Sequence, residues 1–220
     1  MPNGNAARFV LLADYVPDAI IELRYFTGDN FVGRPIEGYL ENTAILTEPA
    51  ALALRAAAAD FAAMGLRVKI VDAYRPCRAV ADFVRWAADP ADDARKADFY
   101  PMLEKRDLFP QGYISERSPH SRGSAVDLTL CDARTGAELD MGGQFDFFGE
   151  ESHSEHRAGL TDGQYANRMC LRRGMEAHGF RYQPEEWWHF NLNGEPYPDT
   201  YFDFPVEAAA VRAGFPQNGN

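Results

Sequence analysis

A carboxylate lies in the middle of a short apolar run, and this feature limits what the chain can fold into. Residues 124–130 read SAVDLTL, which predicts a buried strand with Asp127 near its centre. A buried charge is costly unless it is paired, hydrogen-bonded or bound to a metal. Strand alternation puts the apolar residues Val126, Leu128 and Leu130 on the face opposite to Asp127. We therefore expect a sheet with one core face and a second face that carries a polar site.

Two histidines could reach the face of Asp127. Gly123 lies between His120 and Asp127 and would let the backbone turn tightly. Residues 185–192, EEWWHFNL, predict a second strand that carries His189. Two imidazoles and one carboxylate can fill three positions of a tetrahedral zinc site and leave the fourth for water. Spacing alone favours this metal site no more than a hydrogen-bonded structural histidine and a capped loop aspartate.

Local signals predict the remaining elements. Thr47 as a cap and Gly65 as an end signal indicate a helix between them, followed by a strand at 66–74. Further expected elements are a helix at 76–89, a partly helical stretch to about 106, an irregular segment at 131–160 and a helix from 162 to Gly179. Helices and strands mix without a βαβ repeat, so we expect an α+β fold.

The expected architecture is a single domain over residues 1–220. A small antiparallel or mixed sheet would carry the polar site and be flanked by helices. Residues 1–45 are expected to form an extended N-terminal arm packed on this domain.

Composition excludes several classes of partner. The net charge is -11 and no basic run is present, so neither nucleic acid nor an anionic membrane is an expected partner. Three widely spaced cysteines, Cys77, Cys131 and Cys170, support neither a disulfide framework nor a cysteine zinc site. The sequence contains no signal-peptide pattern and no apolar run near the roughly 20 residues that span a bilayer. The expected location is the cytoplasm, and nothing indicates an oligomeric state.

Two ordered motifs carry a family resemblance. SPHSRGSAVD, at 118–127, matches the S-x-H-x-x-G-x-A-x-D motif of zinc D-alanyl-D-alanine peptidases, and EEWWHF, at 185–190, matches their E-x-x-H motif. The segments LRYFTGDNFVG, VDAYRP and MGGQFDFF extend the similarity over most of the chain. The chain most closely resembles the D-alanyl-D-alanine dipeptidases, including the vancomycin-resistance type.

The resemblance implies one Zn²⁺ per chain, with His120, Asp127 and His189 as its ligands. It also implies that Glu186, three residues before His189, is the general base in a hydrolysis by metal-activated water. Strict alternation would put Glu186 on the face opposite to His189, so the regular strand should begin after Glu186. Glu185 is the competing candidate, and the motif spacing favours Glu186.

The family pattern implies further roles for four residues. Arg75 would stabilise the transition state, although the residues alone favour a strand-end arginine paired with Asp72 or a nearby acid. Asp146 would bind the ammonium of a free dipeptide, and Ser118 and Tyr25 would make polar substrate contacts. The alternative interpretations are a turn aspartate, a loop hydroxyl and a packed aromatic ring.

The resemblance implies a zinc metallopeptidase that hydrolyses the dipeptide D-alanyl-D-alanine, a cell-wall building block. One alternative is a D,D-carboxypeptidase or wall-lytic endopeptidase that acts on longer peptidoglycan peptides. Asp146 argues against it, because an extended acyl chain would collide with this residue. Another alternative is a non-catalytic, zinc-stabilised binding module, and the presence of both Glu186 and Arg75 argues against that.

Overall fold

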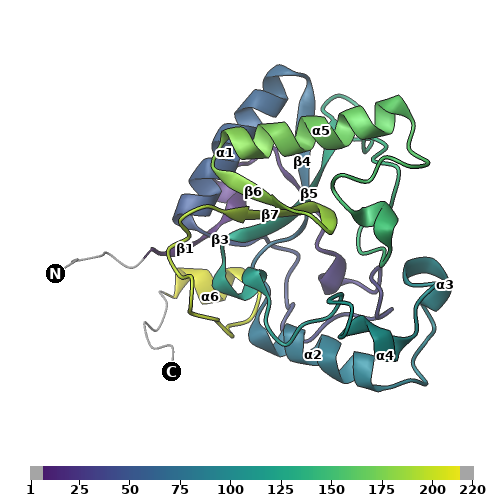
Figure 1. Cartoon of the computed structure of the whole chain (residues 1–220). Helices are drawn as coiled ribbons and strands as arrows, with labels where there is room; N and C mark the ends of the chain where they lie inside the picture. The colour runs from purple at the N-terminus through teal and green to yellow at the C-terminus, as the bar shows by residue number, and fades with distance from the viewer. Residues whose placement is uncertain (1–6, 214–220) are drawn as a thin grey trace.

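The computed structural model describes residues 7–213, so the first six residues of the expected N-terminal arm lie outside it (Figure 1). Its strands are β1 Phe9–Leu11, β2 Ile20–Ile21, β3 Ile45–Thr47, β4 Leu66–Asp72, β5 Ala125–Asp132, β6 Phe180–Gln183 and β7 Glu186–Leu192. Its α-helices are α1 Glu48–Ala63, α2 Cys77–Ala88, α3 Lys96–Phe99, α4 Lys105–Leu108, α5 Asp162–Ala177 and α6 Ala208–Arg212. Four short 3₁₀ helices are η1 Leu12–Asp14, η2 Arg24–Phe26, η3 Pro119–Arg122 and η4 Glu150–Ser152.

A five-stranded mixed sheet forms the centre of the fold. The strand order is β2-β4-β5-β7-β6, in which β2 and β4 are parallel and the other neighbours are antiparallel. A separate two-stranded sheet pairs β1 with β3. The predicted α+β class with a small mixed sheet is therefore confirmed.

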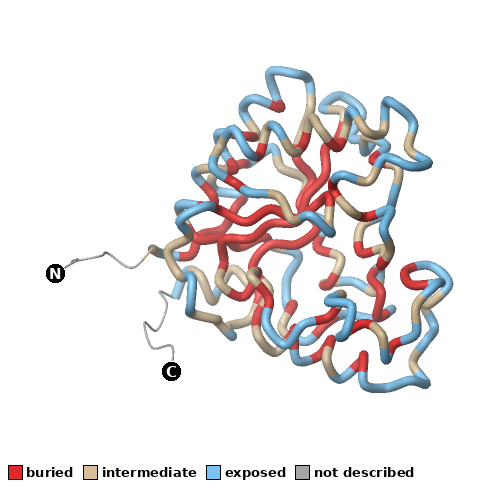
Figure 2. The backbone as a smooth tube through the Cα atoms, in the orientation of Figure 1, coloured by how far each residue is buried: buried red, intermediate tan, exposed pale blue. Residues whose placement is uncertain are grey.

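Helices α1 and α5 lie together along the sheet, and α2, α3 and α4 lie beyond its other side in the view of Figure 1. The sheet strands are the most continuously buried part of the chain (Figure 2). Helices α1 and α5 approach closely at Gly174, where a β-carbon would lie only 2.3 Å from the ring of Phe61. This glycine in the middle of a helix therefore has a packing role.

Strand register determines where the polar site lies. Asp127 of β5 is paired with His189 of β7 on one side and with Asp72 of β4 on the other. The three side chains thus start from one row that crosses three adjacent strands, because paired residues point to the same face of a sheet. All three are buried.

The predicted strands at 66–74, 124–130 and 185–192 and the predicted helices at 76–89 and from 162 agree with the structure to within two residues. Strand β4 ends at Asp72, so residues 73 and 74 of the expected strand lie outside it. Helix α5 begins after its Thr161 cap as expected and ends at Ala177. Strands β1, β2 and β3 and the short helix α6 were not predicted, and β1 and β2 lie within the segment expected to be an extended arm. Strand β6, which forms a hairpin with β7, was not predicted either. None of the helices in the part of the chain that the structure describes is both long and apolar enough to cross a membrane.

Candidate metal centre and active site

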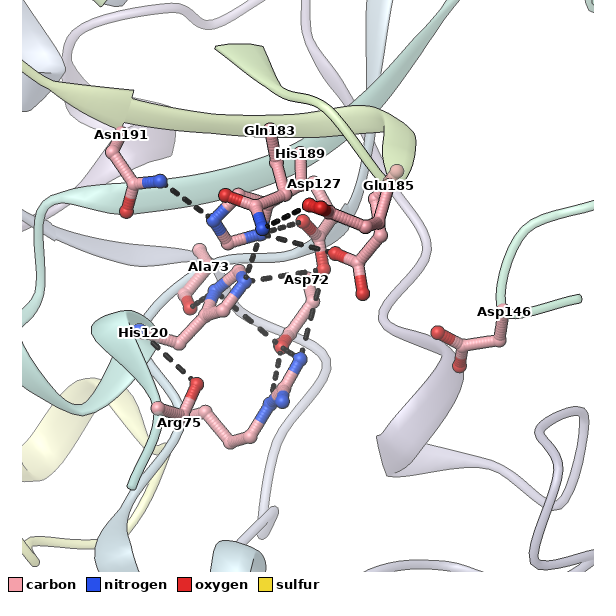
Figure 3. A network of polar contacts seen from close by, with 12 residues as sticks. Asp72, Ala73, Arg75, His120, Asp127, Asp146, Gln183, Glu185, His189 and Asn191 are labelled. Carbon is pink, nitrogen blue, oxygen red and sulfur yellow. Dashed lines mark hydrogen bonds and ion pairs between the residues drawn. The ribbon is translucent and has the colours of Figure 1, made fainter. Parts of the chain in front are cut away.

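Three side chains converge from two strands and a 3₁₀ helix (Figure 3). His120 Nε2 lies 3.0 Å from His189 Nδ1, which in turn lies 2.9 Å from Asp127 Oδ1. The second carboxylate oxygen of Asp127 lies 3.3 Å from His120 Nε2. One potential ligand atom from each residue therefore faces a common point, and the three atoms lie within 4.8 Å of one another.

The local backbone explains how His120 reaches Asp127. The Ser118 side chain accepts a hydrogen bond from the His120 backbone N–H and caps η3. Gly123 ends η3 with φ 80°, and a β-carbon there would lie 2.1 Å from the Phe9 ring. The tight turn expected at Gly123 is thus present, and it takes the chain from His120 directly into β5.

Both imidazoles are held on the side away from the point of convergence. His120 Nδ1 lies 2.6 Å from the backbone oxygen of Ala73 and donates to it, so that Nε2 of a neutral ring has a free lone pair. The side-chain amide of Asn191 lies 2.9 Å from His189 Nε2. Such second partners orient the ligand rings in protein metal sites.

The donor set fits a divalent cation. Burial alone would favour a neutral Asp127, yet His120 and His189 beside it hold the pKa of this carboxyl well below its usual range. A carboxylate and two imidazole nitrogens that face one another present lone pairs to a shared point, and a cation relieves their repulsion. The buried charge of Asp127, which was the main difficulty posed by the sequence, thus has a clear physical reason.

Glu186 lies at the edge of this cluster. Its Oε2 atom is 3.6 Å from His189 Nδ1, and its side chain is 41% exposed into the adjoining pocket. Partial removal of this carboxyl from water raises its pKa, and His189 opposes this rise. Glu185 is exposed, accepts a hydrogen bond from Gln183 and does not line the pocket.

The irregular start of β7 explains how Glu186 and His189 come together. Tyr182 pairs with Phe190, but the next residue, Gln183, pairs with Glu186, so three residues of β7 have no partner in β6. Strand β7 begins at Glu186, whereas the sequence suggested a start after it. The expected break in alternation is present as this irregular pairing within the strand.

The contacts of Arg75 fit both roles that the sequence suggested, a strand-end arginine paired with Asp72 and a cation beside the metal cluster. Its Nε atom donates to Asp72 Oδ2 at 2.9 Å, while Nη2 lies 3.6 Å from Asp127 Oδ2. The guanidinium also lies over the ring of Tyr25, 4.8 Å from its centroid. Asp72 further accepts a hydrogen bond from Tyr39, so a fully buried carboxylate holds the arginine beside the cluster.

A cavity of about 280 Å³ opens in front of the cluster. The predicted site residues all line it: Tyr25, Arg75, Ser118, His120, Asp127, Asp146, Glu186 and His189. Asp146 projects from a different loop and lies apart from the histidines (Figure 3). Its Oδ2 accepts a hydrogen bond of 2.8 Å from the Tyr25 hydroxyl. Burial raises the pKa of Asp146 well above its usual range, and Tyr25 partly offsets the effect.

Asp146 also has an unusual backbone. With φ 62° it is the one non-glycine residue at positive φ within residues 7–213. Such conformations cost roughly 1–3 kcal/mol and concentrate at functional sites. The turn that the sequence suggested here is real, and the residue also faces the cavity.

Sequence reasoning missed the supporting residues. Tyr39 and Asn191 were not singled out, because an aromatic ring or an amide in a half-buried segment has no pattern of its own. Asp72 entered only as an alternative partner for Arg75. Its place immediately before the AYRP segment, at the end of a buried strand, was the available signal.

Comparisons with known proteins agree with this geometry. A family profile described as D-ala-D-ala dipeptidase matches residues 5–207. A D-alanyl-D-alanine dipeptidase of Enterococcus faecalis is 44% identical over 206 residues, which cover 94% of this chain and 100% of that protein. A D-alanyl-D-alanine dipeptidase of Enterococcus faecium is 42% identical over 200 residues, which cover 90% of this chain and 98% of that protein. One of Escherichia coli is 36% identical, with 86% of each chain covered.

Proposed function

The chain belongs to the D-ala-D-ala dipeptidase family of metallopeptidases, and from this premise we propose that it is a zinc enzyme that hydrolyses free D-alanyl-D-alanine. The observation that carries the proposal is that one cavity has the His-Asp-His cluster at one side and Asp146 at another. A free dipeptide has an ammonium close to its peptide bond, and this cavity offers Asp146 for the ammonium and the cluster for the peptide bond.

Zinc would be held by His120, Asp127 and His189. When bound, the ion supplies a Lewis acid for the scissile carbonyl and lowers the pKa of water toward about 7. The ligand set contains no cysteine, and sets of histidines with a carboxylate are common in catalytic zinc sites. Asn191 and the Ala73 backbone oxygen would keep both rings in the orientation that their ligand atoms need.

Glu186 would act as the general base. A carboxylate beside the cluster can take a proton from the attacking water and then deliver it to the leaving amine. Its raised pKa brings the carboxyl closer to neutral pH, where a group that both accepts and donates a proton is most effective.

Arg75 would stabilise negative charge on the substrate oxygen during attack. Its charge is permanent, and its pKa remains well above the usual value despite burial because Tyr25 and Asp72 favour the cation. Asp72 and the two aromatic rings beneath the guanidinium restrict its motion. A preorganised cation of this kind costs little reorganisation when charge develops.

Asp146 would bind the substrate ammonium, with the Tyr25 hydroxyl orienting the carboxylate. Ser118 contributes a cavity-lining hydroxyl, although it already accepts from the His120 backbone. An N-acylated peptide has no ammonium and would leave Asp146 buried against an apolar group, which is unfavourable.

The deciding experiment compares three substrates with the purified, zinc-loaded protein. We expect hydrolysis of D-alanyl-D-alanine, much weaker hydrolysis of L-alanyl-L-alanine and of N-acetyl-D-alanyl-D-alanine, and no activity after chelation. Equal rates on the free and acetylated D-dipeptides would instead favour a carboxypeptidase. Zinc binding without hydrolysis of any of the three would favour a binding module.

A further inference from the structure

Arg168 is a buried cation without a matching anion. It lies on α5 and is 1% exposed, and no carboxylate within residues 7–213 pairs with it. Burial lowers its pKa to about 10, so it is still protonated at neutral pH. A buried, unpaired charge lowers stability, so its presence calls for a compensating role.

The guanidinium instead contacts the two ends of one loop. Nε donates to the backbone oxygen of Met141 at 2.6 Å, and Nη1 donates to that of His153 at 3.2 Å. Between these two residues runs the segment 141–153, which carries Asp146 and has η4 as its only helix or strand. One side chain therefore fastens the beginning and the end of this loop to the same point of α5.

Two further contacts connect this point to the catalytic strand. A β-carbon on Gly143 would lie 3.2 Å from Arg168 Nη2, so the loop backbone crosses close to the guanidinium. The same group lies 5.6 Å from the ring centroid of Trp187, the neighbour of Glu186 in β7. Arg168 thus lies where the loop, helix α5 and the catalytic strand meet.

Asp146 needs such external support. Its positive φ is a conformation that non-glycine residues adopt rarely, so the surrounding contacts help to hold it. The Asp146 carboxylate has one hydrogen-bond partner, the Tyr25 hydroxyl, within the described residues. Phe148 N–H, which donates to the Phe99 oxygen, ties down the loop beyond Asp146.

We propose that Arg168 is a positioning residue that holds loop 141–153 in place and thereby sets the preference for substrates with a free ammonium. The role of Asp146 in this inference rests on the proposed function. Arg168 touches neither the cavity nor the cluster of His120, Asp127 and His189, so its effect should fall on substrate selection and not on metal binding.

Arginine suits this role because its donors form a rigid planar fork. Two carbonyl oxygens from different parts of the chain can be bound at once in a fixed geometry. Lysine keeps the charge, but its single ammonium on a flexible stem cannot reproduce that spacing. The substitution Arg168→Lys therefore removes the fork while it preserves the charge.

The test compares zinc-loaded Arg168→Lys with Arg173→Lys, a control at an exposed position of the same helix. We expect Arg168→Lys to lower kcat/KM for D-alanyl-D-alanine about tenfold or more, mainly through KM, with its zinc content unchanged. The ratio of kcat/KM for free over N-acetylated dipeptide should fall, and amide hydrogen exchange in residues 142–152 should accelerate. The control should match the parent in all of these measurements.

An unchanged substrate ratio together with unchanged exchange in the loop would overturn the inference. An equal loss on both substrates would also overturn it, since that result indicates general destabilisation. If Arg168→Lys does not fold, Gly143→Val disturbs the same contact from the loop side. It should lower the ratio of kcat/KM for free over N-acetylated dipeptide and accelerate amide hydrogen exchange in the loop, as expected for Arg168→Lys. If the parent does not cleave the dipeptide, the proposed function fails, whereas exchange in the loop still tests whether Arg168 holds it.

Discussion

Two buried aspartates in one cavity have opposite electrostatic environments. Asp127 lies against two histidines, and its pKa is held well below the usual range despite burial. Asp146 has a tyrosine hydroxyl as its partner, and burial raises its pKa. The first is therefore permanently charged and suited to a metal. The second gains most from a substrate that brings its own positive charge.

Glu186→Gln should separate catalysis from metal binding. The amide keeps the shape of the side chain but cannot accept a proton, so kcat should fall about 10²- to 10⁴-fold. Zinc content should stay at one ion per chain, because Glu186 is not part of the ligand cluster. Measurements of kcat and of bound zinc check this result. Glu185→Gln, at an exposed position outside the cavity, is the matched control and should keep nearly full activity. If Glu185→Gln is inactive and Glu186→Gln is active, the general base is Glu185 and not Glu186.

Asp146→Asn should selectively lower the activity on the free dipeptide. A charge-assisted hydrogen bond contributes about 1.5–3 kcal/mol, so kcat/KM for D-alanyl-D-alanine should fall about 10- to 100-fold. Hydrolysis of the N-acetylated dipeptide should not fall, because the substitution removes the buried charge that this substrate leaves unpaired. Asparagine tolerates positive φ and can still accept from Tyr25, so the loop should keep its shape.

The raised pKa of Asp146 predicts that the ratio of kcat/KM between the parent and Asp146→Asn depends on pH. A raised pKa means that the Asp146 carboxylate gains its proton at a higher pH than an ordinary aspartate does. As pH falls through that range, the parent loses its advantage over Asp146→Asn, and the ratio of their kcat/KM values should shrink toward one. A ratio that is constant from neutral to acidic pH would contradict the assignment.

At the scale of elements, the junction of η3 and β5 sets the distance between His120 and Asp127. Gly123→Ala would force a side chain into positive φ and place its β-carbon 2.1 Å from the Phe9 ring. We expect a loss of about 2–4 kcal/mol of unfolding free energy, as strain and overpacking add, together with weaker zinc binding. Gly179→Ala is the control, because it has positive φ but open space, and should cost only about 1–2 kcal/mol. Denaturant unfolding and zinc titration measure both effects, and equal losses in the two variants would exclude the contact with Phe9.

Elements with complete local signals could be predicted from the sequence. Helix α5 has a capping box between Thr161 and Gln164, and β5 has a run of apolar residues bounded by Gly123. Strand β6 has only four residues, FRYQ, directly after a helix, and its pairing with β7 is irregular. Such a strand is stabilised by its neighbour and has too little pattern of its own to be recognised.

The candidate site likewise has features that local sequence patterns predict and features that depend on tertiary contacts. The turn at Gly123 and the strand positions of Asp127 and His189 followed from local patterns, while the resemblance supplied their roles. The conformation of loop 141–153 depends on tertiary contacts such as Arg168 to Met141, and no local pattern encodes it. An arginine on a largely polar helix is expected to be exposed, so its burial could not be foreseen.

At the scale of the whole molecule, the site lies across three strands of the central sheet, and the core packs around them. The row of Asp72, Asp127 and His189 contributes buried charge and polarity where apolar side chains would stabilise the fold more. Part of the stability of the native state should therefore come from the bound ion. Metal binding and folding should be thermodynamically linked.

Removal of zinc should consequently lower the melting temperature. An ion present at 100 times its Kd stabilises the folded state by about 2.7 kcal/mol, which for a chain of this length corresponds to roughly 5–10 °C in Tm. We expect metal analysis to give one zinc per chain and chelation to lower Tm by that amount, with recovery when zinc is added back. His189→Ala should bind zinc poorly and respond little to the chelator. His178→Ala, at a histidine that instead pairs with Asp60 at 2.7 Å, should behave as the parent does. Full zinc retention and a parent-like Tm shift in His189→Ala would remove His189 from the ligand set, because neither can persist when one of three ligands is lost.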